Sequence, residues 1–219
     1  MATKAVVDRA PEKVTDKSEA AAKPRVRDRI FETASDLFYR HGIRAVGVDS
    51  IAQEAGTNKM SFYRAFPSKD DLVAEYLRDQ ERGYFEWWDE TIAPFAGDPR
   101  KQLEALFEAY LDLARFKAKA DCGCKTSRGC ALGNAAVEIP EGNEMLGGIV
   151  HAYKNEIRKR LRKLSREVGA RDPEQLGDAL MLLMEGGYYT RLTYPQNTGP
   201  VAAIAKTARA LIDGQTGKG

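Results

Sequence analysis

The sequence predicts an all-α protein, built as a small three-helix unit followed by a larger helical domain. Apolar residues recur at steps of three and four along most of the chain after residue 25, which is the spacing of one helix face. No stretch alternates apolar and polar residues over a useful strand length. With 219 residues, the chain is long enough for one large domain or two small ones with a sizeable core.

Residues 1–22 are predicted to form a disordered tail, because they carry four Lys or Arg and four Asp or Glu without apolar periodicity. This tail lacks the hydrophobic core of a signal peptide. No run of the chain approaches the roughly 18 apolar residues that a membrane span needs. We therefore expect a cytoplasmic protein without a membrane partner.

Residues 23–69 are predicted to form the three-helix unit. The first helix stops at Gly42, and its apolar face comprises Val26, Ile30, Ala34, Leu37 and Phe38. The segment VDSIAQEAG forms a short second helix that ends at Gly56, and TNKMSFYRAF forms a third that ends before Pro67. Nine Lys or Arg stand against five Asp or Glu in this unit, so a polyanionic partner is expected at this end of the molecule.

The third helix has two chemically different sides. At about 100° per residue, Phe62 and Phe66 fall on one side and would pack on the first two helices. The opposite side and its flanks carry Lys59, Met60, Ser61, Tyr63 and Arg64. Such side chains suit the phosphates and base edges of DNA. The turn AGTN joins the second and third helices as in a helix-turn-helix, and Lys69 beyond the Pro67 turn would contact phosphate.

Residues 25–72 resemble the N-terminal DNA-binding domain of the TetR (tetracycline-repressor-like) family of bacterial transcriptional regulators. The matching motifs are IFETASDLFYRHGI, VDSIAQEAG, TNKMSFYRAF and PSKDDL. The resemblance implies a homodimer that binds double-stranded, palindromic operator DNA, as a repressor released by a small-molecule effector. The DNA-contacting residues that it implies are Ser50, Asn58, Lys59, Met60, Ser61, Tyr63, Arg64 and Lys69. Val48 stands where many members have Thr or Ser, which leaves Asp49 or Ser50 as the expected cap of the second helix.

Residues 70–219 are predicted to form a helical domain for ligand binding and dimerisation. A cavity lined by some of its aromatic residues suits an apolar or aromatic effector, although aromatic stripes at helical spacing are also ordinary core packing. The candidates are Trp87, Trp88, Phe107, Tyr110 and Tyr153. We expect the ligand to enter between residues 100–118 and 143–168, and the helix over 68–90 to carry the resulting shift to the DNA-binding unit.

Two C-terminal segments, residues 174–192 and 200–213, each carry an apolar stripe larger than a monomer would leave exposed. Two copies of each segment would form a four-helix dimer interface. Leu183 and Ile204 are expected to lie in that interface, where a charge would split the dimer.

Three cysteines, Cys122, Cys124 and Cys130, lie within nine residues of one another. An odd number in a cytoplasmic chain argues against a disulfide framework. One interpretation is that Cys130 begins a helix as a small buried residue and that the other two are incidental loop residues. Alternatively, the three thiolates could bind a soft metal or metalloid, or could sense electrophiles with pKa values lowered by Lys125 and Arg128.

The chain lacks the sequence signs of an enzyme, such as a Ser-His-Asp set, a phosphate-binding loop or a pair of carboxylates in a pocket. We therefore predict neither catalysis nor a cofactor. The rival interpretation is a helical sensor or adaptor that uses the helix-turn-helix only as a scaffold and does not bind DNA. Salt-dependent binding to a palindromic duplex would separate the two interpretations.

Overall fold

The chain is helical in the part that the computed structural model describes, which is residues 24–109, 111, 128–194 and 198–217. The α-helices are α1 (Val26–His41), α2 (Val48–Glu54), α3 (Lys59–Ala65), α4 (Lys69–Ile92), α5 (Pro99–Ala109), α7 (Ala131–Glu138), α8 (Glu144–Glu167), α9 (Pro173–Thr190) and α10 (Ile204–Thr216). Short 3-10 helices, Ala93–Phe95 and Gly199–Ala203, follow α4 and precede α10. The all-α prediction is confirmed. The tail predicted over residues 1–22 lies outside the described residues.

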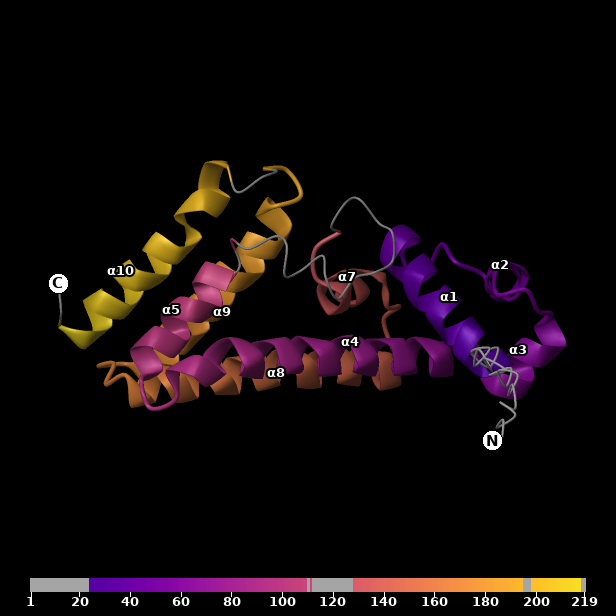
Figure 1. Cartoon of the computed structure of the whole chain (residues 1–219), viewed down its shortest axis with the longest axis horizontal. Helices are drawn as coiled ribbons and strands as arrows, with labels where there is room; N and C mark the ends of the chain where they lie inside the picture. Colours follow the sequence, from indigo (N-terminus) through magenta and orange to yellow (C-terminus); the bar gives the residue numbers. More distant parts are fainter. Residues whose placement is uncertain (1–23, 110, 112–127, 195–197, 218–219) are drawn as a thin grey trace, which may run out of the picture.

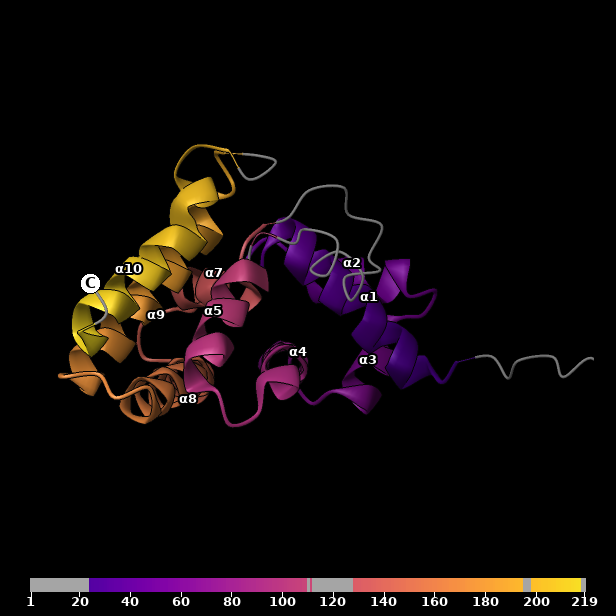
Figure 2. The ribbon, with the colours of Figure 1, turned by 60° about the vertical axis from the view of Figure 1, so that its left-hand side comes forward.

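The molecule is elongated, with α1, α2 and α3 at one end and α5, α9 and α10 at the other (Figure 1). We call the first group the head and the remaining helices the body. The long helices α4 and α8 lie side by side and contact each other along the molecule. Turning the view shows α5, α8, α9 and α10 gathered into one bundle, with the head at the far end (Figure 2). Since α4 begins at the head and ends in this bundle, it links the two parts.

The head is held together by apolar side chains from all three of its helices. Ile30, Phe38, Ile51 and Phe62 are all buried in its core. The first helix stops where the sequence predicts, at Gly42, whose N–H donates to the Phe38 carbonyl at 2.9 Å. Gly42 has a φ of 91°, a conformation that glycine adopts without the steric cost a Cβ would bring.

Helices α8 and α9 are joined by a charged cluster at the surface of the body. The Arg158 and Arg162 guanidinium groups each donate two hydrogen bonds to Asp178, with N–O distances of 2.7–2.8 Å. These hydrogen bonds hold the pKa of the Asp178 carboxyl well below its ordinary value. Bidentate Arg–carboxylate pairs have a fixed geometry, so the cluster sets the register of α9 on α8.

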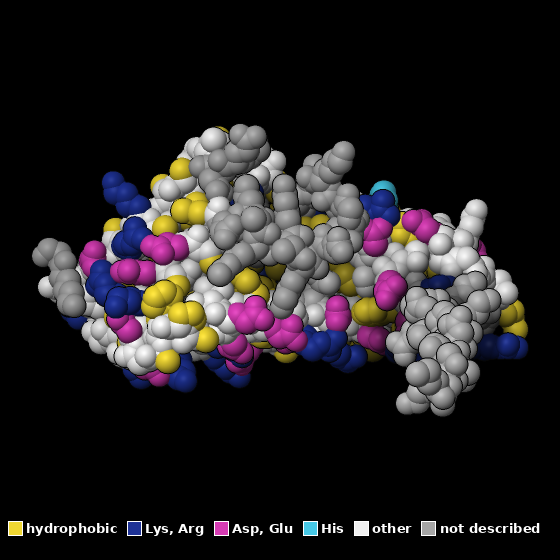
Figure 3. Space-filling view, in the orientation of Figure 1, with side chains coloured by type: hydrophobic (Ala, Val, Ile, Leu, Met, Phe, Trp, Pro, Cys, Tyr) yellow, Lys and Arg dark blue, Asp and Glu magenta, His cyan; other side chains and the backbone are white. Residues whose placement is uncertain are grey.

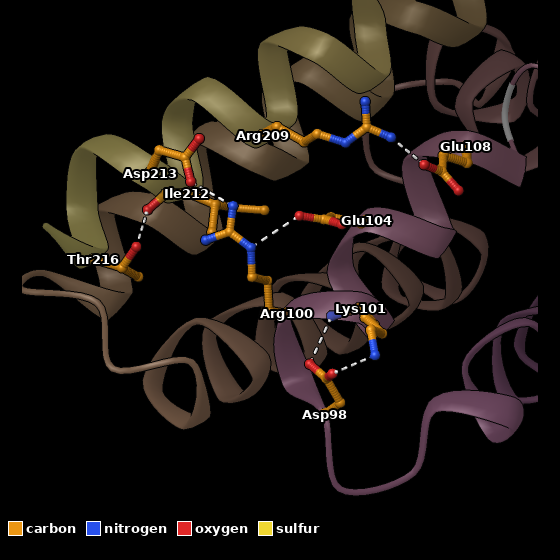
Figure 4. Close-up of polar contacts among 9 residues, drawn as sticks. All are labelled: Asp98, Arg100, Lys101, Glu104, Glu108, Arg209, Ile212, Asp213 and Thr216. Atoms are coloured by element: carbon orange, nitrogen blue, oxygen red, sulfur yellow. Dashed lines mark hydrogen bonds and ion pairs between the residues drawn. The ribbon is translucent and has the colours of Figure 1, made fainter. Parts of the chain in front are cut away.

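Helices α5 and α10 are joined in a similar way (Figure 4). Arg100 on α5 pairs with Asp213 on α10 and with Glu104 on its own helix, while Arg209 on α10 pairs with Glu108 on α5. The side-chain hydrogen bond to Asp213 raises the pKa of the Arg100 guanidinium.

None of the helices in the described ranges is long and apolar enough to pass through a bilayer.

The two segments predicted to form a dimer interface differ in what they expose. On α9, Leu182 has 74% of its surface exposed, and Leu183 is half-buried. Tyr189, Leu192 and Tyr194 continue the exposed apolar side chains toward and beyond the end of α9. Ile204 is only 3% exposed and packs in the core of its own chain. The expectation that Ile204 lies on the interface surface is therefore wrong, because α10 turns that side inward.

Candidate nucleic-acid interface

The position of α3 is set by a polar cap at its start and two aromatic anchors on its inner side. The Ser61 N–H donates to the Asn58 side-chain oxygen at 3.0 Å, a helix cap that fixes where α3 begins. Phe62 and Phe66 are buried, with ring centroids 6.1 Å apart. Tyr63 packs edge-on against Phe62 at 5.3 Å between centroids. Phe62 and Phe66 therefore lie on the inner side of α3, as their four-residue spacing predicts.

The outer side of α3 presents long side chains to solvent. Met60 is 68% exposed and Tyr63 46% exposed, and Arg64 is exposed beside them. Hydrophobic and basic side chains lie at the end of the molecule where α3 is found (Figure 3). Ser61 is half-buried. A rigid helix that offers a guanidinium, a phenol and a flexible thioether on one face has the groups that read base edges in a major groove.

Lys59 is also exposed, and its ammonium pairs with Asp49 on α2 at 3.2 Å. This ion pair joins the start of α3 to α2, so the Asp49 carboxylate contacts α3 and does not cap α2. The residue that precedes α2 is Gly47, in an extended conformation and without a side-chain cap. The expectation that Asp49 or Ser50 caps the second helix is therefore wrong, because Val48, Asp49 and Ser50 all lie within α2 and Gly47 holds the cap position. Ser50 lies exposed within the first turn of α2.

Lys69 lies half-buried at the start of α4. Its ammonium donates to the Ile43 carbonyl at 2.6 Å, in the turn between α1 and α2, and lies 6.0 Å from the Phe38 ring centroid. Burial lowers the pKa of Lys69, while the nearby carboxylates of Asp70 and Glu138 act in the opposite direction. The lysine thus holds the head onto α4 in this structure. Its phosphate contact stays a prediction.

The aromatic candidates for effector binding in the described residues pack on one another or in the core. Trp88, Phe107 and Tyr153 are buried, and Trp87 is half-buried; Tyr110 lies outside the described residues. Tyr84 joins this cluster, edge-on to Tyr153 at 5.3 Å between centroids, with its hydroxyl donating to the Met184 sulfur at 3.3 Å. Burial raises the pKa of Tyr153 well above its ordinary value, so its hydroxyl is neutral at any physiological pH.

An open groove of about 820 Å³ adjoins this cluster, between the end of α4, the start of α5 and the outer part of α8. Its apolar wall includes Trp88, Ile92 and Leu164. Arg160 lies at its edge, stacked 4.3 Å from the Phe85 ring centroid and paired with Asp89 at 2.6 Å. The groove lies between the segments where ligand entry was predicted, and it has room for a small organic molecule.

Cys130 is a buried residue at the start of α7. The Gly133 N–H donates to its sulfur at 3.3 Å, and the Tyr153 hydroxyl lies 3.8 Å from it. This environment agrees with a small side chain that caps and packs a helix. Cys122 and Cys124 lie outside the described residues. Within the described ranges, no three His, Cys, Asp or Glu side chains gather closely enough to hold a metal ion.

Two residues for which the sequence predicted no contact with the head join it to the body. Arg128 donates to the last carbonyls of α1, and Glu138 accepts from the Arg44 N–H. Their partners lie 88 to 94 residues away in the sequence. A charged side chain beside a loop looks like solvated surface when the sequence is read alone, so only the fold identifies these two.

The arrangement of α1 to α4 corresponds to a described family of proteins. The family "Bacterial regulatory proteins, tetR family" matches residues 30–76, which run from α1 into α4 and include both helices of the helix-turn-helix. The head and the start of α4 therefore belong to the TetR family. Members of this family are bacterial regulatory proteins.

Individual TetR-type relatives differ in how much of this chain they cover. The HTH-type transcriptional repressor KstR2 of Mycobacterium tuberculosis is 34% identical over 86 residues, which are 38% of this chain and 41% of that repressor. This chain thus spans about two fifths of the length of the KstR2 repressors that it matches. The uncharacterized HTH-type transcriptional regulator YxaF of Bacillus subtilis is 26% identical over 189 residues, 85% of this chain and 94% of YxaF.

The fold of this chain also has a counterpart among solved structures. SCO4454, a TetR-family transcriptional regulator from Streptomyces coelicolor, superimposes with a TM-score of 0.75 at 25% sequence identity. The match covers 87% of this chain and 96% of that chain. The similarity therefore extends over the body as well as the head.

Proposed function

We propose that this protein binds palindromic operator DNA as a homodimer and represses transcription until a small molecule releases it. DNA contact is assigned to residues 23–69, and effector binding and dimerisation to residues 70–219. The observation that carries the proposal is the outer face of α3, where Met60, Tyr63 and Arg64 are exposed on a helix anchored by two buried Phe residues. A face that is solvated yet rigidly held is suited to reading a groove.

The effector is proposed to be apolar or aromatic and to act through the body. The 820 Å³ groove beside Trp88 supports this, because it borders both the end of α4 and the aromatic cluster. At about 1.5 Å per residue, α4 spans roughly 35 Å from this groove to the head. A ligand that moves one end of α4 can therefore change the spacing of two reading helices, provided that it binds the released form more tightly.

Salt dependence tests the proposed DNA binding. We expect the purified protein to prefer a palindromic duplex from beside its own gene over a scrambled duplex of equal composition. Affinity should fall by about a thousandfold or more between roughly 50 and 200 mM salt if several phosphates are contacted. Fluorescence anisotropy over a salt series measures both quantities. Equal affinity for palindromic and scrambled duplexes would support the rival helical sensor or adaptor instead.

The cysteines supply a second test, of the thiol-sensor alternative. Because the Cys130 sulfur is buried and accepts the Gly133 N–H, we expect thiol reagents to have no specific role in release. A variant with Cys122→Ser, Cys124→Ser and Cys130→Ser keeps an oxygen acceptor at the start of α7 and should fold. Operator release by arsenite or N-ethylmaleimide is then measured for both proteins. If a low reagent concentration releases the wild type from the operator but not the triple variant, the protein is a thiol sensor and this expectation is wrong.

A further inference from the structure

The segment 128–138, made of Arg128, Gly129, Cys130 and α7, lies between the head and α9 (Figure 1). At its first residue, the Arg128 guanidinium donates to the Arg40 carbonyl at 2.8 Å and to the Tyr39 carbonyl at 3.3 Å. The Arg128 N–H donates to the Tyr39 hydroxyl at 3.1 Å. The last carbonyls of a helix have no partner within the helix and carry its negative end, so a guanidinium there stabilises α1 and fixes its position.

At the last residue of α7, Glu138 meets the turn that follows α1. Its carboxylate accepts the Arg44 N–H at 3.0 Å and lies directly against Gly42. A Cβ placed on Gly42 would lie 2.7 Å from the Glu138 Oε1 atom. The absence of a side chain at residue 42 therefore serves both the left-handed turn and the close approach of the carboxylate.

The same segment is anchored in the body. Cys130, Leu132 and Ala135 are buried, with the Cys130 sulfur 3.8 Å from the Tyr153 hydroxyl of α8. Gly133 lies beneath Tyr189 of α9 so closely that a Cβ there would be 2.3 Å from the Tyr189 hydroxyl oxygen. A segment that packs on α8 and α9 and bonds to the head at both of its ends restricts rotation of the head about α4.

We propose that Arg128 and Glu138 are positioning residues, a two-point clamp that sets the orientation of the head on the body for operator binding. This inference rests on the proposed function. Contacts with α4 alone, such as Lys69 with Ile43, would hold the head from one side only. Two copies of the protein would then lose more orientational freedom on binding two half-sites. The clamp removes much of that freedom beforehand, and pre-organisation of this kind improves affinity without a new DNA contact.

The clamp is tested with Arg128→Ala, Glu138→Ala and the double variant. Glu141→Ala is the matched control, since Glu141 is an exposed carboxylate three residues further along. Hydrogen exchange of the peptide over residues 39–47 reports the clamp itself. We expect its amides to exchange about tenfold faster in the double variant, with α2 and α3 unchanged. Operator affinity should fall on the order of tenfold, a usual size for coupling between sites, while binding to a scrambled duplex stays as in the wild type.

Each other result counts against the clamp. Unchanged exchange over residues 39–47 would mean that the two contacts do not hold the head in solution. Faster exchange with unchanged operator affinity would mean that the contacts are structural and do not position the head. Higher operator affinity would mean that they hold a released arrangement. If the wild type shows no operator preference at all, the proposed function fails, and the exchange measurement still decides whether the clamp exists.

Discussion

Replacing Leu182 with aspartate is expected to turn the protein into a monomer that has lost operator binding. Leu182 is 74% exposed on α9, and Tyr189, Leu192 and Tyr194 are exposed toward and beyond the end of that helix, so a protomer presents apolar surface there that association would cover. A charge in the middle of such an interface would be buried without a partner, which costs several kcal/mol. A monomer holds one half-site, and losing the second one weakens binding by about 100-fold or more.

Light scattering at micromolar concentration and anisotropy with the operator duplex measure the two effects. Met145→Asp is the matched control, because it places the same charge on an exposed apolar residue of α8. A Leu182→Asp protein that remains dimeric would show that this face of α9 is not in the interface.

Ile204→Asp should have a different effect. Ile204 is 3% exposed, so the variant should unfold and not merely dissociate.

The Leu182 and Ile204 pair shows where the sequence stops being informative. Periodicity identifies an apolar face on both C-terminal segments, because burial against any surface imposes the same spacing. Periodicity does not tell whether the surface that buries this face belongs to the same chain or to a second copy of the protein. In the fold, the periodic faces of both helices pack in the chain's own core, with Ile204 on α10 and Leu180 and Met184 on α9, whereas Leu182 is exposed.

Local features were predicted well because they depend on near neighbours. Phe62 and Phe66 are four residues apart, so a helix through them has one possible inner side, and the stop at Gly42 needs only a glycine. The start of α2 was less certain, since Val48, Asp49 and Ser50 offer near-equal local choices, and the pairing of Asp49 with Lys59 decides against a cap. Contacts such as Glu138 with Arg44 span 94 residues and depend on tertiary structure alone.

Removing the Tyr63 and Arg64 side chains together is expected to abolish operator recognition while leaving the fold intact. Arg64 is exposed and Tyr63 is 46% exposed with one edge-on contact to Phe62, so Tyr63→Ala with Arg64→Ala should lower the melting temperature only modestly. Each lost base contact costs about 1–3 kcal/mol, and two of them bring operator affinity close to the nonspecific level. Lys159→Ala controls for the loss of one positive charge, since Lys159 lies on α8 with a side chain 77% exposed.

Arg64→Lys then separates the two ways in which Arg64 can act on DNA. A guanidinium can bond to guanine through two donors at once, which an ammonium cannot reproduce, whereas either cation neutralises a phosphate. If Arg64 reads a base, Arg64→Lys should lose most of the operator preference and keep the wild-type salt slope and scrambled-duplex affinity. If it contacts only phosphate, the lysine variant should bind both duplexes nearly as the wild type does. Unchanged operator affinity in the Tyr63→Ala, Arg64→Ala double variant would show that α3 is not the reading helix.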